Sequence, residues 1–116
     1  MQAVSKYHPL SHYVWGSGCD GWNLLASDGL SVKQERMPPS TVEKLHYHQH
    51  AQQFFFILSG TATFEVEGEI IHVKSGEGLH IEAMKKHRIS NQTAEDLEFL
   101  LCSQPTTTQD RINENG

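Results

Sequence analysis

Several classes of protein are excluded by what this sequence lacks. It has no cluster of Lys and Arg, and its 14 Asp and Glu residues outnumber its 9 Lys and Arg residues, which gives a net charge of −5. Proteins that bind nucleic acid present a basic patch, so no nucleic-acid partner is expected. The longest apolar run covers residues 54–58, far short of the roughly 20 residues of a membrane-spanning helix, so no membrane partner is expected either.

Cysteine is scarce, and an apolar leader is missing. The only two cysteines, Cys19 and Cys102, are separated by most of the chain, which favours free thiols in a reducing compartment. Residues 1–16 lack the apolar core of a signal peptide, so we expect a cytoplasmic location. Cys102 is expected to be buried in an apolar strand, whereas Cys19, between a glycine and an aspartate, is expected to be more exposed.

Helix-period apolar stripes of useful length are also absent, and short strand-like segments recur instead. Residues 61–67 alternate, with Ala62, Phe64 and Val66 on one face, as in a half-buried strand. Many short strands at regular spacing predict an all-β sandwich or barrel. The length of 116 residues predicts one domain, with an N-terminal arm of about residues 1–20 and a polar C-terminal tail of about residues 104–116.

The run Phe54-Phe55-Phe56-Ile57-Leu58 is apolar on both faces, although a half-buried strand should alternate. Both faces of this strand are therefore expected to be shielded from water by other parts of the protein. Phe55 and Ile57 are expected to face the barrel interior, and the other face is expected to meet the N-terminal arm or a second subunit. We therefore expect a homodimer, which is also the commonest symmetric assembly.

Three histidines indicate a metal-centred pocket. His46 and His48 lie two residues apart, so on a strand their side chains project to the same face. A third, distant imidazole, His87, can complete a set around one cation. Imidazole suits Zn, Cu, Fe and Ni as a ligand.

These residues occur at the spacing of two known motifs. In the first set, two histidines are followed by a glutamine and a glycine; in the second, a glycine is followed by a histidine and an asparagine. The residues are His46, His48, Gln53 and Gly60, and then Gly76, His87 and Asn91. With this spacing the chain resembles a small single-domain cupin of the RmlC-like type over roughly residues 30–103. The resemblance implies a double-stranded β-helix, or jelly-roll, barrel over residues 1–116. It also implies a divalent transition metal (Fe, Mn, Ni, Zn or Cu) bound by His46, His48, Gln53 and His87.

The chain departs from the family pattern at positions that matter. Gln53 stands where the family usually has a metal-binding Glu, so the site has no negative charge to offset a cation; affinity should fall, and the metal should remain a stronger Lewis acid. Gln53 either binds the metal or hydrogen-bonds a water on it. His50, in an expected turn near the pocket mouth, is a spare candidate ligand. Glu82 and Met84 replace a proline and a glycine of the second motif, and Asn91 is expected to hold a loop.

The resemblance leaves three functions open for a small-molecule ligand. The first is a metalloenzyme, a dioxygenase, isomerase or hydrolase acting on a small organic acid, phenol, diketone or sugar derivative. The second is a non-catalytic binder or sensor. The third is a metal-free, sugar-epimerase-like pocket. The catalytic residues are unknown from the sequence, with His50 and Glu35 as the only candidates for a base.

Overall fold

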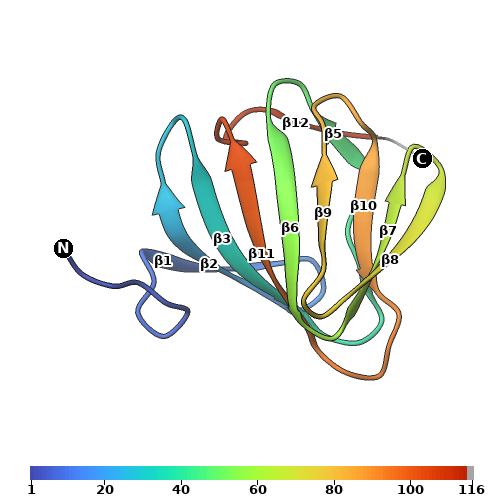
Figure 1. Ribbon diagram of the computed structural model, residues 1–116, viewed down its shortest axis with the longest axis horizontal. Helices are drawn as coiled ribbons and strands as arrows, with labels where there is room; N and C mark the ends of the chain where they lie inside the picture. The colour runs from blue at the N-terminus through green and yellow to red at the C-terminus, as the bar shows by residue number, and fades with distance from the viewer. Residues whose placement is uncertain (115–116) are drawn as a thin grey trace.

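The computed structural model describes residues 1–114, and it consists of two antiparallel β-sheets around a common core (Figure 1). The first sheet has the strand order β1 (Ser11–Trp15), β2 (Cys19–Ala26), β3 (Ser31–Met37), β11 (Leu97–Gln104), β6 (Gln52–Ser59) and β9 (Gly78–Ile81). The second has the order β12 (Arg111–Asn113), β5 (His46–His48), β10 (His87–Asn91), β7 (Thr61–Val66) and β8 (Glu69–Lys74), with β4 (Thr41–Val42) also paired to β10.

This architecture is the predicted all-β jelly roll. Strands distant in sequence become neighbours, because β11 pairs with both β3 and β6 and the chain crosses repeatedly between the sheets. Within the described residues there is no helix that could cross a membrane.

The core forms between the inner faces of the two sheets. Its largest members, Phe64 and Phe99, are fully buried, and Phe55 packs edge-on against Phe64 with ring centroids 5.0 Å apart. The alternation read from residues 61–67 is confirmed, since Ala62 and Phe64 are fully buried and Val66 packs against the cluster.

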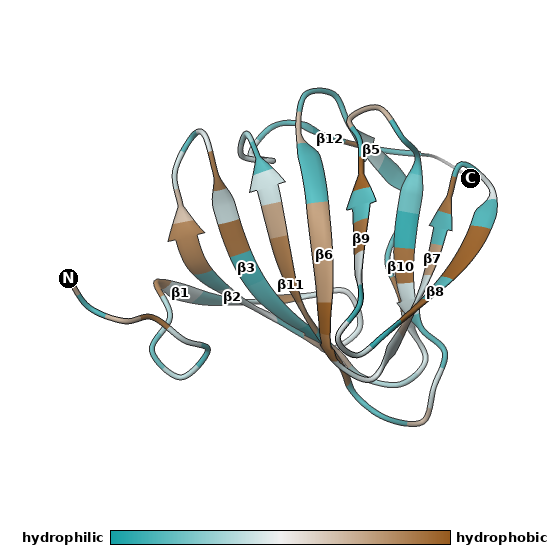
Figure 2. Ribbon diagram, viewed as in Figure 1, coloured by the Kyte–Doolittle hydropathy of each residue, from teal (hydrophilic) through white to brown (hydrophobic). Residues whose placement is uncertain are grey.

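The doubly apolar strand β6 has one covered face and one open face. Phe55 and Ile57 point into the core, as predicted, whereas Phe54, Phe56 and Leu58 remain 43%, 36% and 39% exposed. Figure 2 shows β6 coloured as hydrophobic along most of its length. The N-terminal arm does not cover the outer face, because β1 pairs with β2 at the opposite edge of the sheet from β9 (Figure 1).

The segments expected as an arm and a tail both contribute strands. Residues 11–15 form β1, and residues 111–113 form β12, which pairs with the histidine-bearing strand β5 in the register Arg111↔His48 and Asn113↔His46. Strand β12 therefore lies directly beside the strand that carries His46 and His48.

The expectation for the two thiols was wrong. Cys19 is 1% exposed and belongs to the core cluster, while Cys102 is only partly buried. Cys19 begins β2, and the pleat turns its side chain inward, whereas Cys102 faces outward beside Phe54. Both thiols are free, as predicted.

The turn before His87 contains a strained residue. Met84, where the family motif has glycine, adopts a φ of 70°, a left-handed conformation that costs an L-residue roughly 1–2 kcal/mol. Its backbone N–H donates to the carbonyl of His48 at 2.7 Å, which ties this turn to the end of β5.

Replacing Met84 with glycine is expected to raise the free energy of unfolding by roughly 0.5–1 kcal/mol, because the relieved strain exceeds the extra entropy that glycine gains on unfolding. Chemical denaturation measures the change. Met84→Ala is the matched control: the side chain is 58% exposed, so its truncation costs little, but alanine keeps the strain. A Gly variant no more stable than the Ala variant would contradict the prediction.

Candidate metal centre and its cavity

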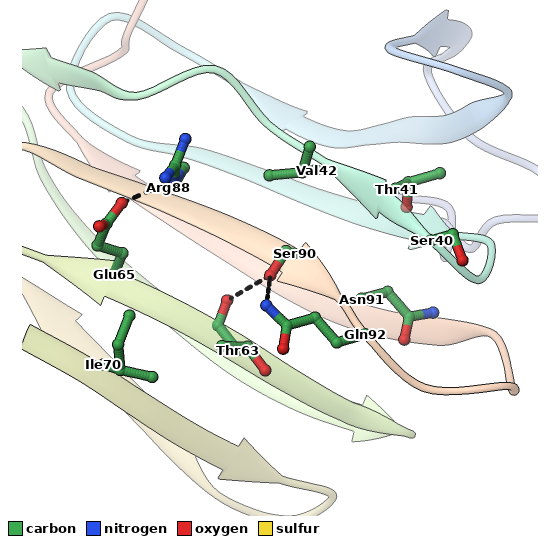
Figure 3. A pocket seen from close by; sticks show the side chains of 10 residues that line it. All are labelled: Ser40, Thr41, Val42, Thr63, Glu65, Ile70, Arg88, Ser90, Asn91 and Gln92. Atoms are coloured by element: carbon green, nitrogen blue, oxygen red, sulfur yellow. Dashed lines mark hydrogen bonds and ion pairs between the residues drawn. The ribbon is translucent and has the colours of Figure 1, made fainter.

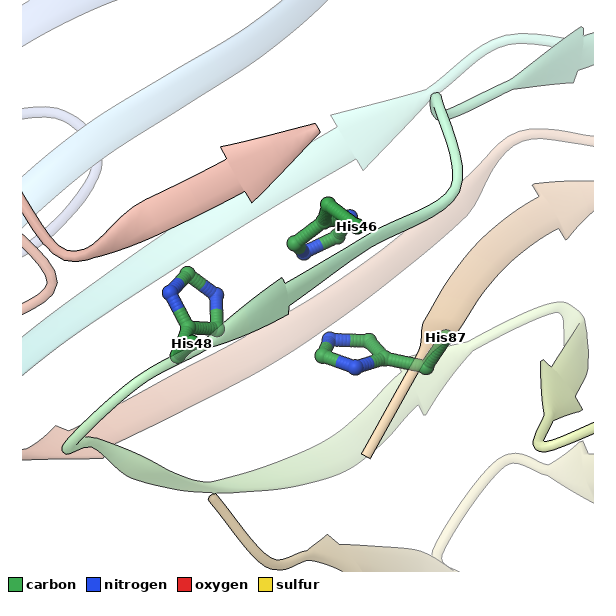
Figure 4. A group of neighbouring side chains, drawn as sticks. All are labelled: His46, His48 and His87. Carbon is green, nitrogen blue, oxygen red and sulfur yellow. The ribbon is translucent and has the colours of Figure 1, made fainter. Parts of the chain in front are cut away.

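Two adjacent strands position the three histidines. On β5 the pleat buries His46 and His48 and turns Tyr47 outward, as the period of two predicts. His87 begins β10 and lies directly opposite His46 in the β5–β10 register. Directly opposed residues on one sheet face are close neighbours, so the third imidazole reaches the first two from the next strand. The three rings converge in Figure 4.

The ligand geometry fits a single ion. One nitrogen from each of His46, His48 and His87 lies within 4.8 Å of the others, and all three residues are buried. Imidazole nitrogens bind zinc at about 2.0–2.1 Å, so small side-chain rotations bring three nitrogens this close onto one ion.

Backbone carbonyls set the tautomers of two rings. Nδ1 of His46 lies 2.8 Å from the carbonyl oxygen of Lys44, and Nδ1 of His87 lies 2.8 Å from that of Lys85. A carbonyl only accepts hydrogen bonds, so Nδ1 carries the proton in both rings and Nε2 keeps a free lone pair. Such an outer hydrogen bond is the usual way in which a metal-binding imidazole is oriented.

Nδ1 of His48 faces the carboxylate of Asp110 rather than a backbone carbonyl. Its Nδ1 is buried without a hydrogen-bond partner among the described residues and lies 4.0 Å from Oδ2 of Asp110, beyond hydrogen-bond distance. Asp110 accepts hydrogen bonds from the backbone N–H groups of His50 and Ala51, which fixes the bend after β5.

Burial keeps these imidazoles neutral. Desolvation is the main cause that lowers the pKa of His46 to about 3 and that of His48 to about 4, with His87 nearby acting in the same direction. Desolvation also lowers the pKa of His87. Metal binding requires the unprotonated ring, so near neutral pH an ion competes with few protons.

Gln53 meets His87 in an unusual contact. Its Oε1 lies 3.2 Å from Nε2 of His87, while its Nε2 donates to Oγ of Ser103 at 3.1 Å. His87 donates its Nδ1 proton to the carbonyl of Lys85, so its Nε2 carries a lone pair. As the amide is placed, Nε2 of His87 and Oε1 of Gln53 therefore face each other without a proton between them. A cation between the two atoms resolves the conflict; an amide turned over, donating to His87 and accepting from Ser103, would resolve it without one.

Other residues singled out in the sequence lie elsewhere. His50 sits in the bend after β5, as expected, but its side chain is exposed and is not among the converging nitrogens. Asn91 is 1% exposed and holds a loop, as expected: its Nδ2 donates to the carbonyls of Met37 at 2.9 Å and Glu95 at 2.7 Å.

A cavity of about 230 Å³ lies beside the histidines. His46, His48 and Gln53 line it together with apolar side chains, among them Phe55 and Leu101. Its remaining wall is polar, and it combines residues near the two ends of the chain with residues on and after β3: Tyr13, Lys33, Glu35, Glu43, Thr107 and Arg111. Sequence reasoning identified only Glu35, because Tyr13 and Arg111 lay in segments expected to be an arm and a tail.

Two carboxylates belong to this wall, a buried one on Glu35 and a largely buried one on Glu43. Glu43 lies 3.8 Å from Nδ1 of His46, and Arg111 lies 3.4 Å from its other oxygen. Burial raises the pKa of Glu43 to about 7, although Arg111 favours the ionised form. Glu35 accepts a hydrogen bond from the Tyr13 hydroxyl, and burial raises its pKa as well.

A larger groove of about 590 Å³ lies on the outer face of the second sheet (Figure 3). Its polar side chains satisfy one another: Arg88 Nε pairs with Glu65 at 2.7 Å, and Gln92 donates to Ser90, which donates to the carbonyl of Thr63. None of the three histidines lines the groove, so the smaller cavity is the candidate site.

Comparison with known proteins agrees with this architecture. The cupin domain model matches residues 33–103, which contain all three histidines and Gln53, and the chain belongs to the cupin family. Its sequence is similar to the oxalate-binding protein of Thermotoga maritima, 31% identical over 83 residues that span 67% of this chain and 69% of that protein.

Two solved structures show the same fold. One is described as a predicted oxalate decarboxylase from Thermotoga maritima, with a TM-score of 0.79 and 22% identity over 90% of this chain and 100% of that one. The other is a sugar phosphate isomerase of the cupin superfamily from Silicibacter pomeroyi, with a TM-score of 0.72 and 18% identity over 83% of this chain and 71% of that one.

Proposed function

We propose that this cupin holds one divalent transition ion on His46, His48 and His87, with Gln53 as a neutral oxygen ligand, and binds a small organic acid beside it. The observation that carries the proposal is the convergence of one nitrogen from each of three buried histidines, with the side-chain amide of Gln53 in contact with His87. Iron, manganese, nickel, zinc and copper are the candidate ions, since the donor set is imidazole with one amide oxygen.

The cavity favours a small ligand with an acidic group. Its volume of about 230 Å³ lies below the usual range of drug-sized pockets, about 300–1,000 Å³. Lys33 and Arg111 place cationic groups on its wall, and a bound ion would add positive charge. The relative from Thermotoga maritima, whose name specifies oxalate, supports this class of ligand.

A catalytic role is the second candidate, and the position of Glu35 favours it. A bound ion would supply Lewis acidity toward a carbonyl or carboxylate oxygen. Glu35 lines the same cavity, where its carboxylate could take up or return a proton of the ligand, whereas the other proposed base, His50, points to solvent.

Reconstitution tests the proposed function. We expect the purified protein, incubated with a divalent metal and desalted, to retain about one ion per chain by elemental analysis, and to bind small acids by calorimetry only in that form. Turnover of a panel of acids, phenols, diketones and sugar derivatives would favour the enzyme over the binder. A protein that retains no ion but binds or converts a sugar derivative would instead support a metal-free pocket.

We also propose that the protein is a homodimer that buries the outer face of β6. The exposed side chains of Phe54, Phe56 and Leu58 form a row, and the register places Leu100 beside Phe56 and Cys102 beside Phe54 on β11. A contiguous apolar face of this kind is typical of an interaction surface, and a two-fold axis lets one patch cover its own copy.

Phe56→Glu is expected to convert this dimer into a monomer, because each interface would then bury an unpaired charge. Sedimentation at micromolar concentration measures the assembly state. Ile70→Glu is the matched control, since Ile70 is 55% exposed on the outer face of the other sheet and should leave the dimer intact. A parent protein that sediments as a monomer would contradict the proposal.

A further inference from the structure

The wall of the cavity that includes Glu35 is built across three strands. Tyr13 on β1 pairs with Gly21 on β2, and Gly21 pairs with Glu35 on β3, so the three residues lie in one cross-strand row. The Tyr13 ring lies over Gly21 to reach Glu35: a Cβ at Gly21 would come within 2.0 Å of the ring. A glycine inside a strand often marks such a close approach.

One oxygen of Glu35 is left for the cavity. The Tyr13 hydroxyl donates to Oε2, and Oε1 accepts no hydrogen bond and forms no ion pair with any residue of the described chain. Glu35 is nevertheless 9% exposed and lines the cavity with His46 and His48. Because Glu35 lines the cavity, a ligand that brings a donor there can hydrogen-bond to this oxygen.

The two sides of the cavity therefore make different demands. Neutral imidazoles and a bound ion favour an anionic, chelating group, whereas the ionised form of Glu35 repels a second negative charge and accepts a hydrogen bond from a donor on the ligand. Burial raises the pKa of Glu35, whereas the Tyr13 hydrogen bond and Lys33 favour its ionised form. Lys33 lies on the same face of β3, with its Nζ 5.6 Å from the centre of the Tyr13 ring. A 2-hydroxy acid meets both demands, because its carboxylate and hydroxyl oxygens can chelate an ion while the hydroxyl hydrogen stays free to be donated.

We propose that Glu35, held by Tyr13 across Gly21, is a specificity-determining residue that selects small chelating acids bearing a hydroxyl group over fully ionised dicarboxylates. This inference rests on the proposed function, because it assumes an ion at the three histidines. It separates this chain in ligand preference from a protein that binds oxalate, whose two carboxylates have no proton to donate.

A pair of probes tests this selection. Glycolate and methoxyacetate offer the same chelating oxygens, but the methyl ether has no proton to donate. Because burial raises the pKa of Glu35, the test is run at alkaline pH, about pH 9.5, above the values documented for buried glutamates. There we expect calorimetry with Zn²⁺-loaded protein to show glycolate binding about tenfold more tightly than methoxyacetate. Glu35→Gln keeps the size and can still accept from Tyr13, but it places an amide toward the ligand.

In Glu35→Gln, the preference for glycolate over methoxyacetate should shrink to about twofold or less, and oxalate should bind more tightly than it does to the parent, because the repelling charge is gone. The two ligands and the two proteins form a double-mutant cycle. A steric effect of the methyl group that is the same in both proteins cancels when the two affinity ratios are compared. Far-UV circular dichroism checks that the variant folds, and the ratio in the parent protein tests the inference without the variant.

The outcomes separate the inference from the function beneath it. Near-equal affinities of the parent for glycolate and methoxyacetate, with the ion retained, would overturn the role of Glu35 and leave the metal site standing. Loss of Zn²⁺ from Glu35→Gln in a chelator competition would make Glu35 a metal ligand and overturn the inference. Failure of the parent to retain any ion would overturn the proposed function and this inference together.

Discussion

Replacing His46 and His48 together with alanine is expected to reduce bound metal from about one ion per chain to near zero. The double variant removes two of three imidazole donors, and the remaining His87 and neutral Gln53 are too few ligands to retain an ion against desalting. Elemental analysis after reconstitution measures the loss. Both side chains are buried, so truncation also leaves cavities that cost stability, and far-UV circular dichroism must show that the sheets persist.

His50→Ala is the matched control for this experiment. It removes an imidazole two residues from His48, but one that is exposed and turned away from the converging nitrogens. This variant should retain the full metal content of the parent. If the double variant keeps one ion per chain while His50→Ala loses it, the ligands have been assigned to the wrong residues.

Gln53→Glu is expected to raise metal affinity by about tenfold or more, equivalent to about 1.4 kcal/mol. The substitution places a carboxylate where the amide oxygen now lies 3.2 Å from Nε2 of His87. Attraction to a dication in this buried position should exceed the desolvation cost of the carboxylate, since the ion itself compensates the charge. Competition with a chelator measures the affinity.

Gln52→Glu separates this contact from a general effect of charge. It adds the same charge one residue earlier on β6, where the side chain is exposed and bonded to Gln104 on the outer face. Its affinity should match that of the parent. If Gln53→Glu leaves the affinity unchanged and His50→Ala lowers it, then Gln53 does not bind the ion, and His50 takes part in the site. A change in neither variant would rule out both arrangements.

Some structural features of this protein can be predicted from a short stretch of sequence, and others cannot. The shared face of His46 and His48 follows from the period of a strand alone, and so does the shared face of Phe55 and Ile57. These are local properties of the backbone, so they can be predicted before the partner strand of each segment is known.

Other features depend on which strands become neighbours. Asp110 reaches the bend at His50 across 60 positions of sequence, and Arg111 reaches Glu43 across 68. Polar residues near the end of a chain carry no local sign of such a contact, so the sequence predicted only a tail. Tyr13 is a similar case, because its reach to Glu35 depends on the pairing of three strands and on the missing side chain of Gly21.

By itself, then, the sequence predicted an all-β fold from local alternation, and its resemblance to the cupin motifs implied a jelly roll with three histidines and Gln53 at the metal site. Only the tertiary structure decided that the Gln53 amide contacts Nε2 of His87, that His50 is exposed, and that Cys19 is buried. It also brought Tyr13, Thr107 and Arg111, from near the two ends of the chain, into the polar wall of the cavity. The physical reason is register: a shift of one residue in a strand pairing reverses which face each side chain occupies, and that register is chosen by the whole packed core.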